Sequence, residues 1–101
     1  MSKKVLFEPF KLGDLTLRNR IIMSPMTRCR ADYKTGIPTE LHAEYYSQRA
    51  SAGLIVSECA YVDWRGHGYA GAPGMTNEEH ANGWKKSVDA VHKKGGLMFA
   101  Q

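Results

Sequence analysis

The sequence is poor in cysteine: its two cysteines, Cys29 and Cys59, stand far apart and outside any Cys-x-x-Cys pair. A disulfide-stapled secreted domain needs a denser, even set of cysteines, so that class is excluded and free thiols of a reducing compartment are favoured. The proline and glycine contents are also modest, with 4 prolines and 10 glycines among the 101 residues. With 43% hydrophobic and 24% charged residues, the composition is typical of a folded globular chain rather than a disordered one.

Long hydrophobic runs are absent as well. The amino-terminal residues MSKK are not followed by an apolar stretch long enough for a secretory signal, and no segment approaches the length of a membrane span. We therefore expect a cytoplasmic protein with no membrane partner.

Charge of one sign is nowhere concentrated. The 14 lysines and arginines and the 10 acidic residues give a net charge of +4, and the basic residues occur as scattered pairs such as Lys85 and Lys86. A nucleic-acid-binding surface usually gathers its basic residues on one face, so we expect no nucleic-acid partner.

Titratable side chains show no metal or catalytic pattern. The histidines have neither H-x-x-x-H nor H-E-x-x-H spacing, so surface positions and no metal site are expected for His42, His67, His80 and His92. Glu58 follows an apolar run, where a general acid or base could stand. An ion pair with Arg20 or Arg28 is the preferred interpretation, because carboxylates are rarely buried unpaired.

The first half of the chain predicts a hairpin, a strand, a helix and a second strand. Apolar and polar residues alternate through residues 10–17 around Gly13 and Asp14, a pattern typical of a hairpin with a tight turn. Residues 20–23 follow as a short buried strand. The spacing of Leu41, Tyr45, Gln48 and Ala52 predicts a helix over residues 39–52, with Gly53 just past its end. Residues 53–57 form a continuous apolar run, as in strands buried on both faces of a parallel sheet.

The second half predicts a long loop, a helix and a third strand. Residues 60–75 are glycine-rich, and loops of this length in compact domains tend to be functional. Thr76 and Glu79 form a capping box, followed by an apolar stripe of Ala81, Trp84, Val88 and Val91. Trp84 is interpreted as a core anchor. Lys93 and Lys94 suit the negative end of the helix dipole, Gly95 and Gly96 end the helix, and residues 97–100 start a strand.

This alternation predicts an α/β fold with parallel strands. Three strands cannot close a barrel, and a complete TIM (β/α)₈ barrel needs about 250 residues. We therefore interpret residues 1–101 as the N-terminal portion of one TIM barrel, with residues 1–18 as a hairpin cap and residues 19–101 as the first barrel units. A self-contained three-stranded domain is the alternative. The unpaired edge of the last strand also makes self-association possible.

Ligands of parallel barrels gather at the C-terminal ends of the strands, which here are residues 24–27, 57–59 and Gln101. A threonine hydroxyl donates one hydrogen bond, and a primary amide both donates and accepts. These ends suit a flat heterocycle with carbonyl and imide groups. The residues alone leave other roles open: Thr27 could cap a local turn, Gln101 could be a satisfied amide, and Cys59 could be a small buried hydrophobe.

Three stretches, LFEPFKLGDLTLRNRIIMSPMTRCRA, EYYSQRASAGLIVSE and GYAGAPGM, strongly resemble the Old Yellow Enzyme family of FMN-dependent ene-reductases. The resemblance runs from about Leu6 to Gln101 and is greatest to the bacterial branch that includes pentaerythritol tetranitrate reductase. It implies that Pro25, Met26 and Thr27 lie under the flavin ring, with the threonine hydroxyl bonded to the flavin C4 carbonyl. It implies further that Gln101 meets the pyrimidine edge and that Cys59 takes a position beside the ring that is usually Ala or Gly.

The resemblance also implies an activity. The expected function is reduction of activated C=C bonds by an oxidoreductase that binds FMN and is reduced by NADPH or NADH. Its expected substrates are small α,β-unsaturated carbonyl or nitro compounds, flanked by Tyr69, although Tyr69 could instead only pin its loop. No catalytic residue is expected within this segment, because the family's substrate-anchoring pair and proton donor have no counterpart in it. The alternative is a truncated, inactive barrel fragment that acts only through association.

Overall fold

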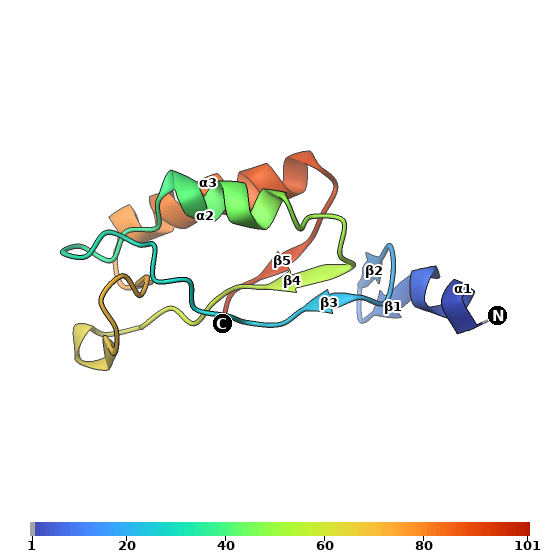
Figure 1. The fold of residues 1–101 in the computed structure, drawn as a ribbon, viewed down its shortest axis with the longest axis horizontal. Coiled ribbons are helices and arrows are strands. Elements are labelled where there is room, and N and C mark those ends of the chain that lie inside the picture. The colour runs from blue at the N-terminus through green and yellow to red at the C-terminus, as the bar shows by residue number, and fades with distance from the viewer. Residues whose placement is uncertain (1) are drawn as a thin grey trace.

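The computed structural model describes residues 2–101. The three-stranded sheet is parallel, with the strand order β3-β4-β5, and α2 and α3 lie together on one of its faces (Figure 1). The elements in chain order are α1 Ser2–Phe7, β1 Phe10–Leu12, β2 Leu15–Leu17, β3 Ile22–Met23, α2 Glu40–Ser47, β4 Leu54–Val56, the 3₁₀ turn η1 Trp64–Gly66, α3 Glu78–Lys93 and β5 Met98–Phe99. Strands and helices therefore alternate after the hairpin, as the sequence predicts. Within residues 2–101, none of the helices combines the length and the apolar character needed to cross a bilayer.

The hairpin of β1 and β2 has the predicted position and register. Phe10 pairs with Leu17 and Leu12 pairs with Leu15, which leaves Gly13 and Asp14 as the turn. Gly13 has a φ of +58°, a conformation that glycine adopts without steric cost. The helix α1, which the sequence analysis missed, precedes the hairpin, and its Leu6 carbonyl accepts a hydrogen bond from the Arg20 amide.

Helix α2 is shorter than predicted. It ends at Ser47, and the chain continues in turns in which Arg49 and Ala50 donate to carbonyls three residues earlier. The prediction that Gly53 ends the helix is wrong. Gly53 instead brings two backbones together: its amide donates to the Ile21 carbonyl at 2.8 Å, and a Cβ atom there would overlap the Asn19 carbonyl oxygen.

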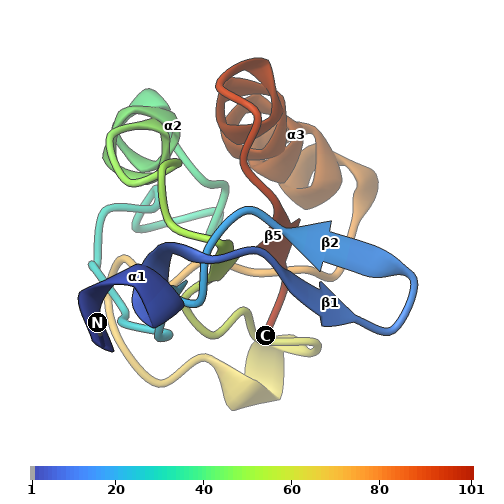
Figure 2. The ribbon, with the colours of Figure 1, turned by 90° about the vertical axis from the view of Figure 1, so that its right-hand side faces the viewer.

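The predicted buried face of α2 is also wrong, by one position. His42 and Tyr46 are buried, whereas Leu41 is exposed. Tyr46 belongs to the core between the sheet and the helices, and Figure 2 shows that α2 and α3 lie side by side above that core. The buried side of α2 is the one whose polar side chains face Glu58, and not the one predicted from the apolar pattern. The remaining core residues are Ala50, Ile55, Ala60, Trp84 and Val91.

Helix α3 begins one residue later than predicted, because its N-cap is Asn77 and not Thr76. The Asn77 side chain accepts from the His80 amide at 2.8 Å, while the Thr76 amide donates to His80 Nδ1. Trp84 and Val91 are buried as predicted, whereas Ala81 is exposed. The C-terminal end is as predicted: Gly95 has a φ of +79°, and the Gly96 amide bonds back to the Val91 carbonyl.

The prediction that the first strand is buried is wrong, because Ile22 in β3 is 53% exposed. Phe99 in the last strand, β5, is also 43% exposed. The reason is geometric, because the helices cover one face of the sheet and β3 pairs only with β4 among residues 2–101. The opposite face and the outer edge of β3 are therefore open.

Candidate functional site

The ends of β4 and β5 are tied together by their backbones. The Ser57 amide donates to the Phe99 carbonyl at 2.8 Å, and the Ala60 amide donates to the Gln101 carbonyl at 3.0 Å. The Ser57 hydroxyl accepts from the Gln101 amide at 3.2 Å. Gln101 is thus fixed alongside the short segment after β4 that carries Cys59.

The chain after β3 reaches the same place. Thr27 and Cys59 line one pocket of about 360 Å³, and its remaining lining residues are Tyr61, Gly66, Gly68, Tyr69 and Ala72. The structure therefore brings Thr27, Cys59 and Tyr69 to a single pocket, with Gln101 held beside it. Pro25 and Met26 do not line this pocket but lie exposed on the segment that leads into it.

The segments at this edge of the sheet carry polar side-chain groups that make no hydrogen bond within the described residues. Among the hydrogen bonds within residues 2–101, none involves the Thr27 hydroxyl or the Gln101 carboxamide. Cys59 is exposed, so its interpretation as a buried hydrophobe is wrong here. The donor set of a hydroxyl and a carboxamide fits the carbonyl and imide edge of an isoalloxazine, and the volume lies in the range of small-molecule sites.

The loop over residues 60–75 is ordered by aromatic packing. Tyr61 is buried and packs edge-on against Trp64 and His67. It forms a parallel bridge opposite Gly74, in which its amide donates to the Pro73 carbonyl and its carbonyl accepts from the Met75 amide. Trp64 and His67 stack with their ring centroids 4.4 Å apart. The loop that carries Tyr69 therefore forms one ordered side of the pocket.

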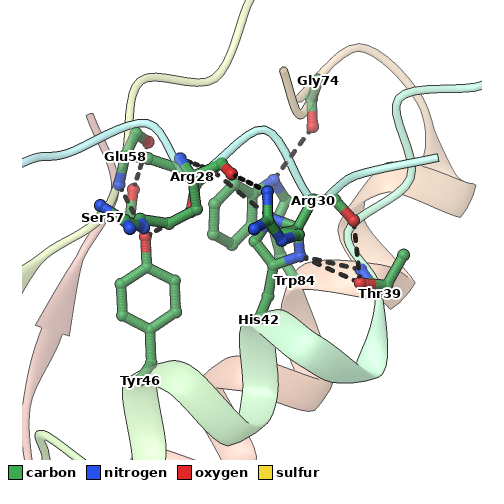
Figure 3. A network of polar contacts seen from close by, with 9 residues as sticks. All are labelled: Arg28, Arg30, Thr39, His42, Tyr46, Ser57, Glu58, Gly74 and Trp84. Carbon is green, nitrogen blue, oxygen red and sulfur yellow. Dashed lines mark hydrogen bonds and ion pairs between the residues drawn. The ribbon is translucent and has the colours of Figure 1, made fainter. Parts of the chain in front are cut away.

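A fully buried carboxylate, that of Glu58, lies beneath α2, where Tyr46 and His42 point toward it (Figure 3). The Tyr46 hydroxyl donates to Glu58 Oε2 at 2.7 Å and accepts from the Glu58 amide at 2.9 Å. The Arg28 amide donates to Glu58 Oε1 at 3.3 Å, and His42 Nε2 lies 3.4 Å from the same oxygen.

The predicted ion pair of Glu58 with an arginine side chain is wrong. Arg20 faces Glu8 at 4.0 Å, and the Arg28 guanidinium lies over the Tyr45 ring, 5.1 Å from its centroid. Glu58 is directed inward and is satisfied by a backbone amide and by side chains of α2. Directing a carboxylate into the core in this way requires hydrogen-bond donors already in place.

The tautomer of His42 follows from its neighbours. The Thr39 amide donates to His42 Nδ1 at 3.0 Å, so this nitrogen is an acceptor and the proton is on Nε2, facing Glu58. Burial raises the pKa of Glu58, but the neighbouring His42 and the hydrogen bond from the Tyr46 hydroxyl outweigh it and hold the pKa below its ordinary value of 4.5. Burial also raises the pKa of Tyr46, which stays a donor.

The surface positions predicted for the histidines are wrong for His42 and His80, which are both buried. Each accepts a backbone amide with Nδ1 at the start of its helix, from Thr39 and Thr76 respectively. Histidine therefore acts here as a capping residue. Over residues 2–101, the structure holds no group of three or more side chains able to bind a metal ion together.

The lowered pKa of Glu58 predicts a pH-dependent stability. Its contribution is fully present above the ordinary carboxyl value of 4.5 and is lost as the pH falls through 4.5 toward the lower folded value. We expect Glu58→Gln to lower the free energy of unfolding by about 1.5–3 kcal/mol at pH 7. The difference from the wild type should shrink below pH 4.5 in urea denaturation series.

The exposed Glu44 on the same helix supplies the control for that series. Glu44→Gln should give a difference from the wild type that stays near zero over the same pH range. A Glu58→Gln difference that is constant from pH 7 to pH 3 would contradict the ionised state of Glu58.

This network was not predicted, although the sequence carries one signal for it. Glu58 directly follows an apolar strand, where a carboxylate must find donors if it is buried. His42 and Tyr46 are four residues apart, so they share one face of a helix. That face, rather than the one carrying Leu41 and Tyr45, covers the sheet.

Comparison with known proteins gives consistent matches over almost the whole chain. The family whose model matches residues 5–101 is the NADH:flavin oxidoreductase / NADH oxidase family. The chain is 45% identical over 97 residues to 12-oxophytodienoate reductase 7 of Oryza sativa subsp. japonica, covering 95% of this chain and 24% of that protein. It is 41% identical over 100 residues to a probable flavin mononucleotide-dependent alkene reductase of Leishmania infantum, covering 99% and 27% respectively.

Solved structures agree with the sequence matches. The old yellow enzyme from Trypanosoma cruzi superposes with a TM-score of 0.94 at 46% identity, covering all of this chain and 27% of that one. The old yellow enzyme homologue from Zymomonas mobilis gives a TM-score of 0.91 at 48% identity, covering 95% and 27%. The chain thus spans about a quarter of the length of the relatives that it matches.

Proposed function

Because this chain belongs to the NADH:flavin oxidoreductase / NADH oxidase family, we propose that it is the N-terminal part of a TIM-barrel, FMN-dependent oxidoreductase reduced by NADPH or NADH. The observation that carries this proposal is the meeting of Thr27 and Cys59 in one pocket, with Gln101 tied alongside. Parallel barrels bind their ligands at this end of the strands. The matched flavin reductases, each about four times as long, support the same conclusion.

In this proposal each strand end has its own part in holding the flavin. The Thr27 hydroxyl donates to a ring carbonyl, the Gln101 carboxamide meets the pyrimidine edge, and the small Cys59 side chain leaves room for the ring. Pro25 and Met26 form the bed under it. When bound, FMN supplies the hydride-transfer chemistry that no side chain can perform.

The proposed substrates are small electrophilic alkenes, such as α,β-unsaturated carbonyl or nitro compounds. Support comes from the Leishmania relative, which is described as an alkene reductase. Tyr69 borders the same pocket as Thr27 and would flank the substrate with its ring. The residues that anchor and protonate the substrate would come from the remaining three-quarters of the protein.

The proposal is tested on the full-length protein by the absorbance of its bound flavin. Purified protein should carry FMN, whose visible band NADPH or NADH bleaches under anaerobic conditions and an enone such as cyclohexenone restores. A full-length protein that takes up no FMN would overturn the proposal. Bleaching without recovery would limit the proposal to a flavin reductase with another acceptor.

Removing the Thr27 hydroxyl should slow flavin reduction. A hydrogen bond to an oxygen that gains charge in the reaction is worth about 1.5–3 kcal/mol, so Thr27→Val should lower the stopped-flow rate of FMN reduction about 10- to 100-fold. Thr16→Val, on the exposed face of the hairpin, is the matched control and should leave the rate unchanged. Equal rates in both variants would mean that Thr27 does not face the flavin.

A further inference from the structure

Glu58 is a buried carboxylate that lies next to the two chain segments carrying Thr27 and Cys59, both of which line the candidate pocket. It directly precedes Cys59, and its Oε1 accepts from the amide of Arg28, the residue after Thr27. We infer that Glu58 is a positioning residue, which sets Thr27 and Cys59 relative to one another and places a fixed negative charge behind the flavin. This inference rests on the proposed function.

The main chain and the side chain of Glu58 are both held. Its amide donates to the Tyr46 hydroxyl at 2.9 Å, and its carbonyl accepts from the Ser57 hydroxyl at 2.9 Å. The direction of the following residue, Cys59, is therefore fixed from both sides. The carboxylate also accepts a hydrogen bond from the Arg28 amide. A shift of Glu58 would therefore move both segments that border the pocket, the one carrying Thr27 and the one carrying Cys59.

Helix α2 controls this position through the hydroxyl of Tyr46. That single oxygen accepts from the Glu58 amide and donates to Glu58 Oε2, which closes a ring between the helix and the strand end (Figure 3). His42 Nε2, one turn earlier, lies 3.4 Å from Oε1 and has no hydrogen-bond partner of its own within residues 2–101. Two hydrogen-bond donors, the Tyr46 hydroxyl and the Arg28 amide, thus hold the carboxylate, with the His42 ring beside it.

The charge of Glu58 has a separate consequence. All of its partners are neutral groups: a tyrosine hydroxyl, a backbone amide and the neutral tautomer of His42. The negative charge is therefore not cancelled by a cation, and its field is poorly screened because the group is buried. A flavin that gains negative charge on reduction is opposed by this field, so Glu58 should lower the reduction potential of the flavin.

Two substitutions in the full-length FMN-bound enzyme separate charge from geometry. Glu58→Gln keeps the shape but removes the charge, and it should move the FMN reduction potential to a more positive value. Tyr46→Phe keeps the charge but removes the hydroxyl that orients it, so it should weaken FMN binding about tenfold without a positive shift of the potential. Glu44→Gln, an exposed carboxylate on the same helix, is the control and should change neither quantity.

The readouts are the potential from anaerobic dye-linked titration and the FMN dissociation constant from fluorescence. A purely structural Glu58 would lose stability in these variants without moving the potential in one direction, and that result would overturn the inference. If Glu58→Gln does not fold, an FMN affinity in Tyr46→Phe equal to that of the wild type overturns it, and a tenfold loss supports it. If the wild type itself binds no FMN, the proposed function fails and the inference fails with it.

Discussion

Replacing Trp84 by alanine should lower the free energy of unfolding of the protein by about 3–5 kcal/mol. Trp84 is 5% exposed and packs between α3 and the sheet, in the core that contains Tyr46, Ile55 and Val91. Its indole also donates to the Gly74 carbonyl at 3.0 Å, which anchors the end of the 60–75 loop. The variant therefore loses buried apolar surface, leaves a cavity and strands a buried carbonyl oxygen.

Two further variants separate these causes in urea denaturation experiments. Trp84→Phe keeps much of the ring but removes the donor, so its cost should be smaller than that of Trp84→Ala. Trp64→Ala removes the same side chain from a site that is 59% exposed and should change the free energy of unfolding little. Equal losses for Trp84→Ala and Trp64→Ala would contradict the core position of Trp84.

Adding one methyl group at Gly53 should destabilise the protein by about 1–3 kcal/mol. The Cβ atom would overlap the Asn19 carbonyl oxygen, and that backbone cannot withdraw easily. The Asn19 side chain is bonded to the Ser51 carbonyl at 2.8 Å, and the Gly53 amide is bonded to Ile21. The close approach joins β3 to β4, so Gly53→Ala pushes apart the strands that lead to the pocket.

Gly68→Ala is the matched control for Gly53→Ala. A Cβ atom at Gly68 meets nothing within 4 Å, so the same chemical change occurs there without a clash. Thermal unfolding of the two variants should show a lower midpoint for Gly53→Ala only. If both variants have the same unfolding midpoint as the wild type, the backbones at Asn19 and Gly53 are farther apart in solution than in the structure.

Local signals in the sequence were sufficient for the strands and turns. The hairpin depends on a Gly-Asp turn between alternating residues, and β4 on a continuous apolar run, and both features act over a few neighbouring residues. The faces of the helices were harder to predict. Leu41 and Tyr45 have the right spacing for a buried stripe, yet His42 and Tyr46 are the buried residues, and they face the buried carboxylate of Glu58. An apolar pattern carries no information about such a distant polar partner.

The candidate site was predictable in part for a related reason. The C-terminal ends of parallel strands meet at one edge, so an α/β pattern already predicts that Thr27, Cys59 and Gln101 lie near one another. The pocket wall at Tyr69 depends on packing within the 60–75 loop, and the buried carboxylate beneath α2 depends on residues from three separate segments. Long-range contacts of this kind produce no recognisable spacing pattern in the sequence.

The open outer edge of β3 has a consequence for the biosynthesis of the protein. The closed barrel that we propose has no free edges, so in it β3 obtains its second neighbour from a strand outside residues 2–101. In the barrel that we propose, this segment leaves the ribosome before the strand that pairs with β3, so its unpaired amides and the exposed Ile22 wait until that strand has been translated. A circular permutation that places that last strand directly before β3 would shorten this delay and reduce the time during which nascent chains can associate wrongly.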